Sequence, residues 1–208
     1  MTRRLDIHAE KKLRGRARHE RAFFAAMAAL DGWTPAATDR PFENAKLPVF
    51  EKAVSQRHGT PTFRRAVVAR LLDQAASLAQ RTAAQRIPAQ RIPAQRIRAR
   101  VAAIIDWPGL WLSELCVFHD ADHAHSFDPA IRSLEPRPAR TYWDGGWVEA
   151  RHPARELLSD LKLTLPTGFT AHGTEIAEYD RDTDHLSIRE EWVVMQSPAA
   201  IPSERYLP

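Results

Sequence analysis

The chain has 208 residues, an apolar fraction of 44%, six tryptophans and a net charge of +4. This length suits one domain with a single core, and the composition excludes an intrinsically disordered chain. The lone cysteine, Cys116, excludes an internal disulfide and predicts a reducing compartment. Because no apolar segment follows the charged first residues, and none is long enough to cross a bilayer, we expect a cytoplasmic protein with no membrane partner.

Much of the positive charge lies near the start of the chain, where residues 1–21 contain eight lysines and arginines and three acidic residues. We expect a basic helix within residues 1–30, with candidate partner contacts at Arg14, Arg16 and Arg18. Such a segment would bind phosphate or an acidic protein. No aromatic side chain is interleaved to stack on bases, so the pattern favours a solvated helix face over a nucleic-acid interface.

The clearest helical pattern begins after Gly59. Thr60 offers an N-cap hydroxyl, and Pro61 suits the first helical turn because its missing N–H has no partner there. Apolar residues then recur at spacings of three and four: Phe63, Val67, Val68, Leu71, Leu72, Ala75 and Leu78. This spacing predicts a long amphipathic helix with one buried face.

A five-residue unit is repeated three times after this helix, over residues 85–99, and residues 85–97 are the candidate spacer. A period of five matches neither helix nor strand, and the prolines at 88 and 93 block a continuous helix. We expect a spacer loop with solvated arginines, and a functional basic ribbon is the less favoured alternative.

A β-hairpin is predicted over residues 98–118, with its turn at Trp107-Pro108-Gly109. Proline and glycine in the middle of a turn suit type II geometry, in which the glycine has a positive φ. Strands joined this tightly must be antiparallel neighbours. Cys116, in the second strand, is interpreted as a buried thiol and not as a nucleophile.

Three more strands are expected. Lys46 to Ser55 is a candidate edge strand, because Pro48 cannot donate to a neighbouring strand. Two others, 170–179 and 185–195, follow a turn at Pro166-Thr167-Gly168. Alternation along the last strand would place on one face Leu186, Ile188, Glu190, Trp192 and Val194, with Glu190 in need of a partner.

Residues 132–147 are rich in proline, glycine and aromatic residues, which predicts a loop. Its side chains Trp143 and Trp147 would fold back on the core or, if exposed, mark a partner surface. Residues 153–163 are expected to form a short helix, and residues 197–208, with three prolines, a loose tail.

These elements predict a single α+β domain over residues 1–196. We expect an antiparallel sheet of about five strands with the amphipathic helix packed on one face. The portion with the order strand, helix, hairpin, helix, strand resembles a split βαβ arrangement.

The strongest candidate for chemistry is a corner after the hairpin that contains three histidines and two aspartates. If it is helical, His119, Asp122 and His123 would share a face and present ligands to a divalent metal such as zinc. Asp120 and Glu114 would then be candidate catalytic carboxylates. This set is too small to complete a zinc motif without a further histidine from elsewhere, so a hydrated corner with capping aspartates is favoured, with no metal or other cofactor.

Three short motifs together resemble a bacterial family catalogued as domain of unknown function 3916. They are Lys12-Leu13-Arg14-Gly15, the segment from Trp107-Pro108-Gly109-Leu110-Trp111 to His119-Asp120, and Leu163-Thr164-Leu165-Pro166-Thr167-Gly168-Phe169. The resemblance covers most of residues 11–195. It implies no activity, and His123 and the triple repeat depart from the family pattern.

No glycine-rich phosphate loop, Cys-x-x-Cys pair or serine-elbow motif is present. We therefore expect a non-catalytic cytosolic binding protein, of the immunity type that neutralises a toxin partner. The first alternative is a metal-dependent hydrolase or nuclease that uses the His119 to His125 corner. The second is a nucleic-acid-binding protein that uses the basic N-terminus. The sequence does not give an oligomeric state.

Overall fold

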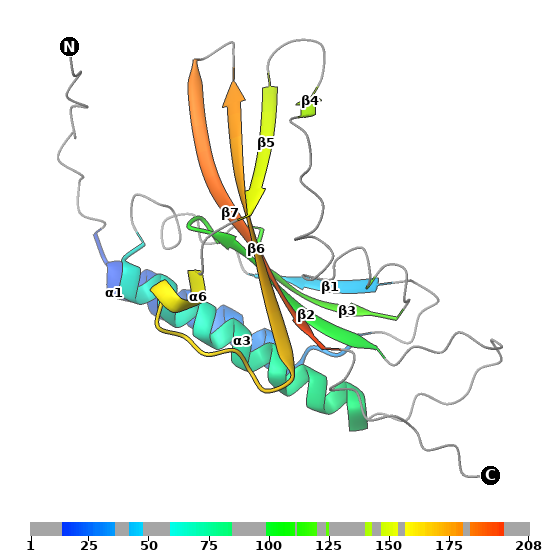
Figure 1. Ribbon diagram of the computed structural model, residues 1–208. Helices are drawn as coiled ribbons and strands as arrows, with labels where there is room; N and C mark the ends of the chain where they lie inside the picture. The colour runs from blue at the N-terminus through cyan, green and yellow to red at the C-terminus, as the bar shows by residue number, and fades with distance from the viewer. Residues whose placement is uncertain are drawn as a thin grey trace, which may run out of the picture.

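The computed structural model describes the following residues: 14–35, 42–47, 59–84, 99–110, 112–119, 124, 140–142, 147–153, 157–180 and 184–197. For residues 84, 140–142, 147–153, 157, 178–180, 185 and 187, the description covers the backbone only. The predicted spacer over 85–97 and the tail beyond residue 197 lie outside the described residues. The described chain has the predicted α+β class, with helices on an antiparallel sheet (Figure 1).

Within the described residues, seven strands form one sheet in the order β1-β3-β2-β7-β6-β5-β4. Their bounds are β1 (Phe42–Lys46), β2 (Arg100–Trp107), β3 (Glu114–Phe118), β4 (Arg140–Tyr142), β5 (Trp147–Pro153), β6 (Phe169–Asp180) and β7 (His185–Gln196). All neighbouring strands are antiparallel. Since β1 and β2 both pair with β3, they run in the same direction on either side of it, and α3 joins them, as in a split βαβ arrangement.

Strand β4 and the first residue of β5 lie in the predicted loop over 132–147, and the last residue of β5 is the first of the predicted helix over 153–163, so those expectations are wrong at these positions. No element was predicted for residues 148–152. β5 pairs with β6 from Trp147, opposite Asp180, to Pro153, opposite Thr174. This long-range pairing outweighs the preference of a proline- and glycine-rich segment for a loop. The stability of a strand depends more on its neighbours in the sheet than on its local sequence. Of the predicted helix over 153–163, the described residues contain α6 (Leu157–Asp160), whereas Pro153 belongs to β5, residues 161–163 are not helical, and residues 154–156 lie outside the described residues.

The remaining helices are α1 (Arg16–Met27), the 3-10 turn η1 (Ala28–Gly32) and α3 (Pro61–Ala84). The backbone N–H of Phe63 donates to Thr60 Oγ1 over 3.1 Å, which confirms the predicted cap of α3. None of the helices in the described ranges combines the length and apolar character that a membrane crossing requires.

The core lies mainly between α3 and one face of the sheet. The whole predicted apolar face of α3 is buried. It packs with α1 and with alternate residues of three strands: Val101, Ala103, Ile105, Leu115, Val117, Trp192 and Val194. The other face of these strands carries a second buried cluster that includes Ile104, Cys116, Phe118 and Met195. Central strands buried on both faces explain why residues 101–105 read as a continuous apolar run.

The predicted hairpin is present, but its turn is not type II. The backbone N–H of Leu110 donates to Asp106 O over 2.6 Å, and the Trp107–Pro108 peptide bond is cis. Leu110, not Gly109, takes the left-handed conformation, with φ of 62°. Its side chain is only 1% exposed, so burial in the core holds a backbone conformation that leucine otherwise avoids.

Of the strand expected from Lys46 to Ser55, the structure describes Lys46 and Leu47. The observed strand, β1, ends at Lys46, and residues 48–55 lie outside the described residues. Among the described strands, β1 pairs only with β3 and ends the sheet order. The edge position predicted from Pro48 is not tested by β1, which ends before this proline.

The predicted common face of β7 divides along its length. Trp192 and Val194 are buried under the helices, whereas Leu186 and Ile188 are 57% and 52% exposed. Figure 1 shows the reason, since β5, β6 and β7 extend well beyond the helix layer. Trp192 Nε1 donates to Glu190 Oε2 over 2.8 Å, so the partner of this carboxylate is an indole.

Gly173 lies opposite Trp192 in the ladder, and a Cβ added to it would lie 2.4 Å from the buried indole ring. We expect Gly173→Ala to lower the free energy of unfolding by about 1–3 kcal/mol, because the ring has no room to shift. The measurement is urea denaturation followed by tryptophan fluorescence. Gly32→Ala is the control, because its Cβ would meet nothing within 4 Å. Equal stability of the two variants would contradict the close packing.

Candidate functional site

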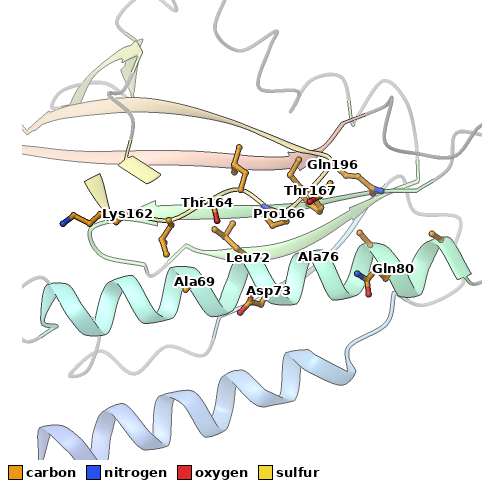
Figure 2. Close-up of a pocket in the computed structure, with 15 residues that line it drawn as sticks. Ala69, Leu72, Asp73, Ala76, Gln80, Lys162, Thr164, Pro166, Thr167 and Gln196 are labelled. Carbon is orange, nitrogen blue, oxygen red and sulfur yellow. The ribbon is translucent and has the colours of Figure 1, made fainter. Parts of the chain in front are cut away.

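A groove of about 640 Å³ lies between α3 and the loop from Lys162 to Phe169 (Figure 2). One wall consists of residues of α3: Ala69, Leu72, Asp73, Ala76, Ala79, Gln80 and Ala83. The other wall consists of Lys162, Leu163, Thr164, Leu165, Pro166, Thr167 and Phe169, with Gln196 at the end of β7. The groove therefore joins three segments that are far apart in the sequence.

Small side chains on α3 create the space for the groove. Ala69, Ala76 and Ala83 recur every seven residues and so lie on one side of the helix, next to its buried face. Leu72 is 3% exposed and forms part of the floor. Asp73 is exposed on the outer side, so the helix wall changes from apolar at the floor to polar at the rim.

The loop wall is anchored at both ends. Arg65 Nη2, on α3, donates to Lys162 O over 3.1 Å. At the other end the backbone N–H of Ser197 donates to Gly168 O over 2.7 Å. Between them, the predicted turn at 166–168 is confirmed by a bond from Phe169 N to Pro166 O of 3.1 Å and by the φ of 80° at Gly168. These bonds keep the groove preformed.

The described lining of the groove is mostly apolar. Among the described lining residues, the ionisable groups are Asp73 and Lys162, which are both exposed, and there is no histidine or cysteine. Figure 2 shows Lys162 and Gln196 toward opposite ends of the groove. An apolar floor with a polar rim is the usual anatomy of a surface that recognises another molecule by shape.

The predicted metal corner is only partly described. His119 directly follows β3, and its Nε2 lies 4.0 Å from Glu43 Oε1 on β1. Asp120, Asp122, His123 and His125 lie outside the described residues. Within the described ranges, no group of three histidines, cysteines or carboxylates comes together as a metal site would need.

Glu114 and Cys116 lie side by side on the second face of the sheet. Glu114 Oε2 accepts a hydrogen bond of 2.6 Å from Asn44 Nδ2, and Glu114 Oε1 accepts one of 3.7 Å from Cys116 Sγ. Burial raises the pKa of the Cys116 thiol, and the negative charge of Glu114 raises it further. The predicted buried thiol is confirmed. Both oxygens of Glu114 accept hydrogen bonds within the sheet, which supports a structural role for this carboxylate.

The residues predicted to contact a partner differ in their exposure and in whether the structure describes them. Arg14 and Arg18 are exposed, whereas Arg16 is half-buried. Trp147 begins β5, but only its backbone is described, and Trp143 lies outside the described residues.

A comparison with protein-family models matches residues 25–196, which is most of the chain, to the family described as "Protein of unknown function (DUF3916)". The chain belongs to this family. The match confirms the resemblance seen in the sequence, although the Lys12-Leu13-Arg14-Gly15 segment precedes it. Comparisons with curated proteins and with solved structures found no match.

The DUF3916 match includes both walls of the groove, since α3 and the Leu163 to Phe169 motif lie within it. Sequence reasoning did not identify this site. A signal was present in the seven-residue spacing of alanines at 69, 76 and 83, because small residues beside the apolar stripe of a helix leave room above it. The sequence did not show that the 163–169 motif would lie across from them.

The reactivity of the Cys116 thiol tests whether the second face of the sheet is buried. We expect Cys116 to react with a thiol reagent at pH 8 at least about 100-fold more slowly than in urea, since burial keeps the folded thiol protonated. The measurement is the labelling rate with 5,5′-dithiobis(2-nitrobenzoate). Rapid labelling of the folded protein would show instead that the thiol is accessible and ionised.

Proposed function

We propose that this protein is a non-catalytic binding protein that holds a segment of a partner protein in the groove between α3 and the 162–169 loop. The observation that carries the proposal is the preformed groove itself, with an apolar floor and a loop wall anchored by Arg65 and Ser197. A site that is already ordered loses little conformational entropy when it binds.

The groove fits an extended segment. The lining positions from Ala69 to Ala83 span 14 helical steps, about 21 Å along α3. An extended chain covers that distance with about six or seven residues. Small aliphatic side chains suit a floor made by Leu72 and Ala76, and an acidic residue suits the ammonium group of Lys162 at one end. The proposed occupant is therefore an extended, largely apolar segment with a carboxylate.

We further propose that the partner is a toxin and that the protein is of the immunity type and acts in the cytoplasm. A neutralising protein needs a complementary surface and no chemistry of its own. The apolar floor of the groove supports such a role. No specific observation favours the metal-dependent hydrolase, because His119 is the only member of its predicted ligand set among the described residues, and it lies next to Glu43.

Filling the groove tests this proposal. Ala76 is half-buried in the helix wall, and Ala76→Trp would occupy the space above the floor. We expect Ala76→Trp to weaken binding of the partner more than about 10-fold, because an indole and an extended segment cannot share the groove. The control is Ala66→Trp, at an exposed position on the same helix outside the groove, about 15 Å along its axis.

Both variants and the wild type serve as bait for affinity purification, and titration calorimetry with the purified partner then gives the affinities. A partner retained by the wild type and Ala66→Trp but lost by Ala76→Trp supports the proposal. If no protein shows this pattern, the groove is not the binding site. If a partner shows this pattern, expression of that partner alone should arrest cell growth. Co-expression of the wild-type protein should restore growth, and co-expression of Ala76→Trp should not. A partner that leaves growth unaffected would contradict the immunity role alone.

A further inference from the structure

Helix α1 presents arginines on the side away from the core. Arg18 and Arg21 are three positions apart and exposed, and Arg14 is exposed in the turn just before the helix. Phe23 and Met27, which are fully buried, lie on the opposite side of α1. The packing of α1 therefore directs a row of positive charges toward solvent.

These arginines differ from those of α3 in what they contact. On α3, the side chains of Arg65, Arg70 and Arg81 bind, respectively, Lys162 O, the carboxylate of Asp31 and the carbonyl oxygen of Trp33. Such arginines hold the fold together. The side chains of Arg14, Arg18 and Arg21 make no hydrogen bond or ion pair within the described part of the chain, and the first turn of α1 contains no acidic residue.

The rest of this face is small and lacks large apolar groups. Its other exposed positions include Ala17, Ala22 and Ala25. A membrane-binding helix would need large apolar side chains to insert, and a protein interface would need a buried apolar or aromatic anchor. A single strand of nucleic acid would need aromatic side chains on which its bases could stack. The face offers charge alone, which matches the regular phosphates of a duplex.

We infer that the arginine face of α1 binds the phosphate backbone of double-stranded nucleic acid without reading its sequence. Arg14, Arg18 and Arg21 donate to phosphate oxygens, and the intervening alanines allow the helix to approach the backbone closely. This inference is independent of the groove, which lies between α3 and the 162–169 loop.

The test is fluorescence anisotropy with a labelled mixed-sequence 20-base-pair DNA duplex over a range of salt concentrations. The affected variant is Arg18→Gln/Arg21→Gln, and the control is Lys46→Gln/Ala66→Glu, which lowers the net charge by the same two units at exposed positions elsewhere, outside the groove. Each lost phosphate contact removes about 0.9 from the slope of log affinity against log salt. We expect the first variant to lower the slope by nearly two and the affinity at about 50 mM salt more than 10-fold, while the control keeps the wild-type slope.

Three results would overturn the inference. The first is failure of the wild type to bind the duplex even at the lowest salt concentration. The second is an equal loss of affinity in both variants, which would show an effect of net charge only. Tighter binding to a single-stranded 20-mer, or to vesicles containing phosphatidylserine, would assign the face to another partner. Circular dichroism checks that α1 stays folded, as expected because glutamine is a good helix former.

Discussion

The packing of α3 on the sheet is the interaction on which the rest of the structure depends. Val67, Leu71 and Leu78 are fully buried, and they belong to the same core as Ile105 and Val194 of the central strands. Burial of each such side chain stabilises the fold by about 1.5–3 kcal/mol. This packing fixes which side of α3 faces the sheet, and so it also fixes which side is left for other contacts.

Both proposed surfaces follow from that constraint. The alanines beside the buried face of α3 become one wall of the groove, and Arg65 on the same helix anchors the opposite wall. Phe63 makes edge-to-face contacts with Phe23 and Phe24, at centroid distances of 5.6 Å, which attach α1 to α3. Because α1 is held by this aromatic side, its arginines point to solvent. One apolar helix thus positions a groove for a protein segment and a basic face for a polyanion.

The periodicity of apolar residues predicted which side chains of α3 are buried, but it did not predict which distant segments would cover a given strand or helix. The spacing from Phe63 to Leu78 identified α3 and its buried face, and Pro-Gly at 108–109 identified the hairpin. Alternation along β7 placed Leu186 and Ile188 on the same face as Trp192. Their side chains are nevertheless exposed, because the helix layer ends before them. Strand β5 was missed because its pairing with β6 is long-range. The groove was missed for a related reason, since its two walls are about 90 residues apart in the sequence.

Native-state hydrogen exchange tests the central claim most directly. If α3 and the sheet form one packed unit, the amides of Val67 and Leu71 in α3 and of Ala103 and Ile104 in β2 should exchange only through global unfolding. They should then share one opening free energy, the highest in the protein, and it should fall in parallel as denaturant is added. Exchange of the α3 amides at a clearly lower free energy than those of β2 would contradict the account, because the helix would then detach while the sheet stays folded.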